Sequence, residues 1–452
     1  MPGGGTWVAQ NKKLPGAYIN FVSVPRPVGI LGTRGVVAIA LPMIWGAEDE
    51  LIEVYGSDLI DGKSLAKIGC TAFDSEISLP YRLALSRCYK ALFFRSDKGG
   101  VKATKAQSPL TISAKYAGSV GNNIAIAIID NKRDDGTYTV QVIYKEVLKE
   151  EFVVKTLGEL ELVESEWVNF TVSTESESLA PTPTAGINLT GGTNGTVNKE
   201  SYTKFFELLK RADWQCMAIQ TSDETVPPLE KDFIALCRDE LGKKVQAACT
   251  DYDTDYEGII KCSQGYKTKL ETVSPELFQI WVASQTAGAA VNQSNTGLVV
   301  EDAVDIVNYY DKPEVEKKLA TGWFVLSERQ DGAIVVEQDI NSYHSFTVNK
   351  NKEFRKNRII RVLDEIGNTT ALIFNRNYLG KMDNNEIGRS SFLGELINLC
   401  DTLQNENAIQ EFKGAEDISV MQGDELDAVL VEFTIKPVDA MEYLYMTVNV
   451  RV

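Results

Sequence analysis

The sequence predicts a multidomain protein that combines an α/β fold with a separate all-β domain and extended terminal arms. Three observations lead to this prediction. The chain has 452 residues, which corresponds to about three domains at roughly 150 residues each. Strand and helix patterns alternate over 197–345, which is typical of an α/β layer with a mostly parallel sheet. Short strands at regular spacing over 101–190 indicate a small all-β domain.

The first hundred residues predict one isolated strand and then a mixed block. Residues 16–24, GAYINFVSV, alternate in side-chain direction and stop at the PRP of 25–27. Further on, 35–45 are β-rich, 77–90 have helical spacing and 91–95 form a short apolar run. The opening block is therefore expected to alternate strands and helices.

Two polar segments border the predicted all-β domain. Residues 96–109 and 173–196 are rich in Gly, Ser, Pro and charged residues, which is typical of linkers. Between them the strands are separated by turn signals such as AGSVGNN and DDGT, with no helical segment. We expect an all-β domain joined to the rest by two linkers, of which the second, 173–196, should be exposed.

Beyond the second linker the pattern predicts a layered α/β unit. Helices are expected at 201–213 and 227–243, and short buried strands at 215–220 and 244–250. Residues 276–292 are expected to begin as a strand and continue as a helix rich in small residues.

The last hundred residues predict two helices and two strands. Helices are expected at 351–366 and 390–412, and a strand at 427–437. In that strand Val429, Val431, Phe433 and Ile435 share one face. A second strand, 442–452, runs to the last residue and would reach about 33 Å at ~3.3 Å per residue. The strands at the two ends either pair within the chain or pair with another copy, and the pattern alone favours neither.

Composition excludes several classes of function. The single histidine, His344, rules out a multi-His metal site, and no GxSxG or phosphate-binding loop is present. Residues 251–258, DYDTDYEG, resemble the start of a calcium loop, but Gln264 stands where that loop needs glutamate, so a solvated loop is favoured. Seven scattered cysteines indicate reduced buried thiols. No cofactor and no metal is therefore predicted.

Charge and hydropathy restrict the partners. A net charge of −17 argues against nucleic-acid binding. No stretch approaches the ~20 apolar residues of a membrane helix, and the N-terminus lacks a signal-peptide core, so synthesis and folding in the cytoplasm are expected. The first 47 residues carry +4 and residues 416–452 carry −6, which either steers one copy toward another or is accidental.

A basic cluster lies at 350–361. It is either a solvated helix face or a docking face for an acidic neighbour, and its basic members are Lys350, Lys352, Arg355, Lys356, Arg358 and Arg361.

Three long strings are distinctive: GGTWVAQNKKLPGAYINF, INSYHSFTVNKNKEFRKNRIIRVLDEI and PVDAMEYLYMTVNVRV. They resemble one known family, the contractile tail sheath proteins of myophages and R-type, phage-tail-like bacteriocins. The resemblance implies an inserted β-sandwich, a subtilisin-like α/β domain without protease activity, and an α+β C-terminal domain. The implied divisions are an N-terminal arm 1–25, a first core part 26–100, the insertion 101–192, the α/β domain 193–345, the C-terminal domain 346–440 and a C-terminal arm 441–452.

The resemblance also implies a structural function. Family members stack as hexameric rings around a tail tube, exchange terminal strands between subunits and contract to drive the tube through a cell envelope. Implied partners are further copies of the chain, the tube protein, and baseplate and terminator proteins, with no nucleic acid and no membrane insertion. The alternatives are a tube or baseplate subunit and, more remotely, an α/β hydrolase.

Carried onto this sequence, the resemblance implies four sets of site residues. The N-arm strand would contain Tyr18, Ile19, Asn20, Phe21 and Val22, and the C-arm strand Tyr443, Tyr445, Thr447, Val448 and Val450. The receiving strand would contain Val429, Val431, Phe433 and Ile435. Candidate contacts with the tube are Lys352, Arg355, Lys356, Glu395 and Asn398.

Overall fold

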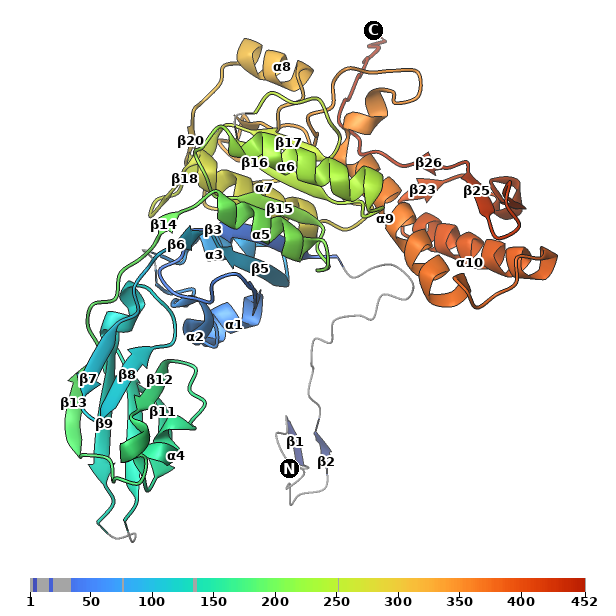
Figure 1. The fold of residues 1–452 in the computed structure, drawn as a ribbon. Coiled ribbons are helices and arrows are strands. Elements are labelled where there is room, and N and C mark those ends of the chain that lie inside the picture. The colour runs from blue at the N-terminus through green and yellow to red at the C-terminus, as the bar shows by residue number, and fades with distance from the viewer. Residues whose placement is uncertain are drawn as a thin grey trace. The chain divides into compact units, whose positions relative to one another are not determined.

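A computed structural model describes residues 34–74, 77–132, 136–250 and 252–451, together with the backbone of residues 3–5 and 16–18 (Figure 1). The chain divides into two compact units, Met1–Thr33 and Arg34–Val452. In the first unit β1 (Gly3–Gly5) pairs in parallel with β2 (Gly16–Tyr18). Of the predicted N-arm residues, Ile19, Asn20, Phe21 and Val22 lie outside the described residues.

The centre of the second unit is a six-stranded sheet. Its order is β17 (Ile259–Cys262), β16 (Gln246–Thr250), β15 (Cys216–Ile219), β3 (Val36–Leu41), β5 (Lys90–Arg95) and β4 (Leu51–Tyr55). Every neighbouring pair is parallel except β4 with β5, which confirms the prediction of a mostly parallel sheet. All six residues of β3 are buried, as expected for a parallel strand covered on both faces.

Helices cover the two faces of this sheet. Val37, Ile39 and Leu41 of β3 point into one core with α7 (Pro275–Gly288) and α3 (Leu79–Ala84). The alternate residues Val36, Ala38 and Ala40 point into a second core with α5 (Glu200–Leu209) and α6 (Val226–Ala235). A π-helical turn, η3 (Leu236–Glu240), continues α6, and two short helices are α1 (Gly56–Asp61) and α2 (Leu65–Ile68).

Helix α7 corrects one prediction. Residues 276–292 were expected to start as a strand, but the segment is helical from Pro275. Phe278 through Ala287 are all buried, so apolar residues occupy every side of this helix. A segment that is apolar on all sides lacks the 3.6-residue period, and short buried helices then resemble strands in sequence.

The all-β domain contains two sheets around one core. One sheet has the order β11 (Val147–Val154), β10 (Tyr138–Tyr144), β9 (Ile124–Asp130), β13 (Thr184–Asn188). The other has the order β12 (Val168–Val172), β8 (Leu110–Ala114), β7 (Thr104–Gln107). The prediction of no helical segment is wrong, because α4 (Leu157–Glu161), η1 (Ser119–Asn123) and η2 (Thr174–Ser176) lie here. The Thr156 hydroxyl caps α4 by accepting from the Glu159 amide.

Each of the two predicted linkers contains strands. Residues 96–109 contain β6 (Asp97–Lys98) and β7, and 173–196 contain β13 and the start of β14 (Thr196–Val197). β6 pairs with β14, so the entry and exit of the domain are tied together. Buried Asp97 accepts hydrogen bonds from Arg95 Nη2 (2.7 Å) and the Met43 amide (2.7 Å). These bonds satisfy a buried carboxylate that lies in a predicted linker.

Smaller elements complete the α/β unit. They are the sheet β19 (Thr272–Val273), β18 (Gly265–Lys267), β20 (Asp305–Val307), the hairpin β21 (Leu326–Glu328) with β22 (Ile334–Val336), and α8 (Lys312–Ala320).

The C-terminal region follows the predicted order with shifted boundaries. Its elements are η4 (Lys352–Arg355), α9 (Asn357–Ile373), η5 (Phe374–Tyr378), α10 (Glu386–Asn405), β23 (Ile409–Gln410), η6 (Gly414–Glu416), β24 (Ile418–Gln422), β25 (Val429–Phe433) and β26 (Lys436–Pro437). The first helix begins six residues later than predicted, since 352–355 form a 3₁₀ turn. Residues 438–451 form no strand within the chain, unlike the strand predicted at 442–452.

Candidate assembly site

The β24–β25 hairpin is an incomplete sheet. Its two strands pair antiparallel from Ile418 with Phe433 to Gln422 with Val429. Among the described residues no third strand joins either edge. The predicted alternation is confirmed over β25, where Val429, Val431 and Phe433 are half-buried and the residues between them are exposed. Ile435 lies beyond the end of the strand.

Two-stranded sheets are only marginally stable without further packing. Here β24 packs against α10, whose Leu396, Leu399 and Leu403 are buried (Figure 1). The outer face carries one exposed apolar cross-strand pair, Met421 with Leu430. The hairpin therefore offers a free edge and an uncovered surface.

The C-terminal tail, residues 438–451, is the most exposed apolar segment of the described chain. Tyr443, Leu444, Tyr445, Met446, Val448 and Val450 are 68%, 85%, 92%, 74%, 70% and 80% exposed. Exposed apolar side chains in such numbers usually mark an interaction site. Glu442 is the exception, with its side chain only 5% exposed.

The candidate tube contacts fall into two groups. The side chain of Lys352 is 77% exposed, Asn398 is exposed, and half-buried Glu395 accepts from Tyr378 Oη (3.0 Å). Arg355 and Lys356 instead have partners in this chain: Arg355 donates to the Leu319 carbonyl (2.6 Å) and Lys356 to Glu442. Contact with a tube stays a prediction for all five.

The basic cluster at 350–361 does not form one helix face. η4 separates Lys352 and Arg355 from α9, and Arg361 on α9 is only 1% exposed. Arg361 donates to Asp339 (2.6 Å), whose side chain is equally buried. The acidic neighbour expected for this cluster is thus partly supplied by the same chain.

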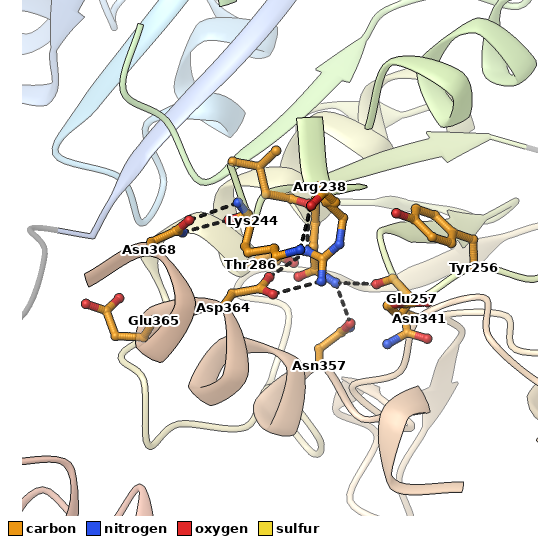
Figure 2. Close-up of polar contacts among 12 residues, drawn as sticks. Arg238, Lys244, Tyr256, Glu257, Thr286, Asn341, Asn357, Asp364, Glu365 and Asn368 are labelled. Carbon is orange, nitrogen blue, oxygen red and sulfur yellow. Dashed lines mark hydrogen bonds and ion pairs between the residues drawn. The ribbon is translucent and has the colours of Figure 1, made fainter. Parts of the chain in front are cut away.

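A buried polar junction fastens α9 to the central α/β unit (Figure 2). Arg238, in the turn that continues α6, donates to both carboxylate oxygens of Asp364 on α9, at 2.7 and 2.8 Å. The same guanidinium donates to the Val245 carbonyl (3.0 Å). Asn368, one turn further along α9, accepts from the amide of Lys244 and donates to its carbonyl, both at 2.9 Å.

Electrostatics favour the charged state of this junction. Burial alone lowers the pKa of Arg238, but the Asp364 carboxylate outweighs burial and raises that pKa above its ordinary value. Arg34 also faces α9, at 3.9 Å from Glu365, and burial lowers its pKa. Arg34 therefore belongs to the interior, although the sequence placed it among the basic residues of an N-terminal steering charge.

Sequence reasoning missed Arg238, Asp364, Asn368 and Asp339. One available signal was the composition of α9, where Asp364 and Glu365 interrupt the buried series Ile359, Ile360, Val362 and Ile366. Charged residues on an apolar helix face are rarely buried without partners, so they indicate a buried ion pair.

The two sequence candidates for chemistry, His344 and the acidic loop, have partners within the described chain. His344 Nδ1 lies 2.8 Å from the Ser342 carbonyl and 3.4 Å from Asp255, and the buried Ser342 hydroxyl donates to the Tyr256 carbonyl. Among the described carboxylates of the acidic loop, Asp253 pairs with Lys261, Glu257 pairs with Lys350, and Asp255 accepts from the His344 amide. Among described residues, no cluster of three or more His, Cys, Asp or Glu side chains is arranged to hold a metal ion.

In the same described residues, none of the helices combines the length and hydrophobicity required to cross a membrane.

Comparison with known proteins identifies the family. Three phage tail sheath models match in succession: the β-sandwich domain at 98–194, the central domain at 195–342 and the C-terminal domain at 349–451. The phage-like element PBSX protein XkdK of Bacillus subtilis is 30% identical over the full length of both chains.

Solved structures agree with this result. The sheath tail protein of Desulfitobacterium hafniense has 32% identity and a TM-score of 0.78, covering 97% of this chain and 100% of that one. That of Listeria innocua has 31% identity and a TM-score of 0.81, covering 92% and 95%. The contracted helical sheath of the anti-feeding prophage shares the fold at 10% identity, with a TM-score of 0.54 and coverage of 97% and 99%.

The sheets, the junction and the exposed tail define a mixed α/β multidomain protein with a terminal segment suited to pairing with another chain. Within that class, the chain belongs to the phage tail sheath proteins. It is a sheath subunit and a component of a phage or phage-like particle. The resemblance inferred from the sequence is thereby confirmed.

Proposed function

We propose that this chain polymerises as stacked hexameric rings around a tail tube and contracts to drive the tube through a cell envelope. Subunits are joined by exchange of terminal strands. The C-terminal arm, with Tyr443, Tyr445, Thr447, Val448 and Val450, adds a strand beside β25 of a neighbouring copy. The N-terminal arm, 16–24, adds another strand to the same sheet.

One observation carries this proposal. A single chain contains both an unpaired apolar tail and a two-stranded hairpin without a third strand among the described residues. A tail strand from another copy would bury its exposed Tyr, Met and Val side chains and use the open strand edge. Two added strands would turn a marginal hairpin into a sheet of four.

The junction around Arg238 and Asp364 supports a mechanical role. Because α9 is fastened to the central sheet by buried ion pairs, displacement of the hairpin is transmitted to the α/β unit. The proposed tube contact lies on this C-terminal domain, and its residues are Lys352, Arg355, Lys356, Glu395 and Asn398. Further proposed partners are the baseplate and terminator proteins.

The remaining parts of the proposal concern chemistry and location. The α/β unit has a subtilisin-like arrangement without protease activity, and the protein is not an enzyme. Among the described residues, the only histidine faces a backbone carbonyl and a carboxylate. The chain is made in the cytoplasm of a bacterial host and released as part of a particle.

Truncation and electron microscopy test the arm assignment. The full chain is expected to form striated hollow cylinders with its tube protein, and a chain ending at Glu442 is expected to remain folded but form none. Val448→Pro removes one strand donor and should also abolish cylinders, whereas Val448→Thr keeps the donor and should assemble. Cylinders of normal length from the truncated chain would refute strand exchange by this arm.

A further inference from the structure

Beyond Val438, the described part of the tail is held to the body at one place, around Lys356 and just before its most exposed part. Glu442 Oε1 accepts from the Thr296 hydroxyl (2.8 Å), and Glu442 Oε2 accepts from Gln338 Nε2 (3.4 Å) and from Lys356 Nζ. Gln338 also donates to Tyr443 Oη (2.6 Å). Lys356 additionally lies 3.9 Å from Asp439.

The pocket that holds Glu442 is a largely buried site rather than a chance surface contact. The side chains of Glu442 and Lys356 are 5% and 16% exposed, although Met441 and Leu444 on either side of Glu442 are largely exposed. In the part of the chain that the structure describes, no hydrogen bond joins 444–451 to the rest. One carboxylate and one phenol therefore carry the attachment.

The three chain segments that surround the buried carboxylate of Asp339 also form the pocket for Glu442. Asn295, Asp339 and Asn357 face inward: Asp339 accepts from the Asn295 amide (2.9 Å), from Asn357 Nδ2 (2.9 Å) and from Arg361. Their chain neighbours Thr296, Gln338 and Lys356 hold Glu442. The Asp339 amide donates to the Thr296 hydroxyl (2.9 Å), which links the two sets directly. The pocket is thus positioned by the rigid part of the molecule.

We propose that Thr296, Gln338 and Lys356 form a latch for Glu442 and Tyr443 that gives the C-terminal arm two working lengths. With the latch closed, the free arm begins at Leu444. With the latch open, the next attachment is the Val438 amide, which donates to the Ala408 carbonyl (3.0 Å). Opening releases residues 439–443 and lengthens the reach by about 16 Å at ~3.3 Å per residue.

An arm with two lengths would keep a subunit connected to its neighbours while the subunits rearrange. In this respect the latch rests on the proposed function. A pull on the tail loads the Gln338–Tyr443 hydrogen bond first and the Lys356–Glu442 pair next, since these are the first two attachments met from the C-terminal end. Thr296, Gln338 and Lys356 are positioning residues: they set where the arm leaves the body.

A distance measurement on the full chain at a concentration where it sediments as a monomer tests the latch. All seven native cysteines are buried, so spin labels can be directed to Tyr445→Cys on the tail and Glu316→Cys on α8. Tyr445 is two residues from the closed latch and seven from Val438. Since chain extension scales with the square root of length, opening should widen the distance distribution about twofold.

Glu442→Ala and Lys356→Met are expected to give this widening, and Glu425→Ala, an equal loss of charge at an exposed site, is expected to leave the width unchanged. An unchanged width in both latch variants, or equal widening with Glu425→Ala, would overturn the latch. Assembly is scored separately by electron microscopy. A latch detected in a chain that never forms cylinders would leave this inference standing and refute the proposed function.

Discussion

The two ends of the C-terminal region differ in how completely they satisfy their own groups. At α9, Arg238, Asp364, Arg361 and Asp339 are buried and hydrogen-bonded within the chain. At the hairpin and the tail, apolar side chains and strand edges are left exposed. One region pairs its buried charges within the chain, and the other leaves apolar side chains uncovered. Under the proposed function, a subunit that moves without unfolding needs both properties in one domain.

Removing a buried ion pair at α9 should have the largest effect on the free energy of unfolding. Asp364→Ala leaves the buried Arg238 guanidinium without its carboxylate, which is expected to cost ~3–5 kcal/mol in the free energy of unfolding. Urea denaturation monitored by circular dichroism measures the loss. The exposed pair Arg329–Asp331 supplies the control, and Asp331→Asn should leave the midpoint unchanged. Equal midpoints for Asp364→Ala and wild type would mean that the junction does not fasten α9.

Leucine truncations sharpen the same contrast. Leu396 on α10 is fully buried, and Leu396→Ala should cost ~2–5 kcal/mol through lost burial and a residual cavity. Leu444, 85% exposed in the tail, should give no change in the stability of the unassembled chain when replaced by Ala. The denaturation midpoints of the two variants check this. A lower denaturation midpoint for the Leu444→Ala monomer would show that the tail packs against its own chain.

A smaller, pH-dependent effect is expected inside the sheet-helix core. Glu230 on α6 is fully buried, and burial raises the pKa of its carboxyl well above the ordinary value of 4.5. The folded state therefore holds a proton that the unfolded state loses above about pH 4.5, so this group's contribution to stability falls as pH rises from there. Glu230→Gln should remove that decline. Melting temperatures from pH 5 to 8 should diverge between wild type and variant, and parallel curves would contradict the assignment.

Regular elements were predictable from local pattern. β3, β5, β15 and β16 are short apolar runs bounded by polar residues, and a parallel strand covered on both faces requires that composition. The alternation of Val429, Val431 and Phe433 and the apolar character of the tail were likewise present in the sequence. The long strings shared with tail sheath proteins identified the family.

Partners far apart in the chain were not predictable. The predicted linker at 96–109 contains β6 because its partner β14 lies about a hundred residues later. The basic cluster suggested a docking face, yet Arg361 and Lys356 find Asp339 and Glu442 inside the same chain. Local composition shows that a residue is charged, but not whether the fold places an oppositely charged side chain beside it.

The sequence by itself determined the family, the order of strands and helices, and the apolar tail, because each depends on residues that are adjacent along the chain. Only the tertiary structure decided which polar residues are interior and where the tail is held. Arg238 and Asp364 are separated by 126 positions and Lys356 and Glu442 by 86. A buried charge becomes tolerable only when the fold brings such a pair together, since desolvation must be offset by a partner at hydrogen-bond distance.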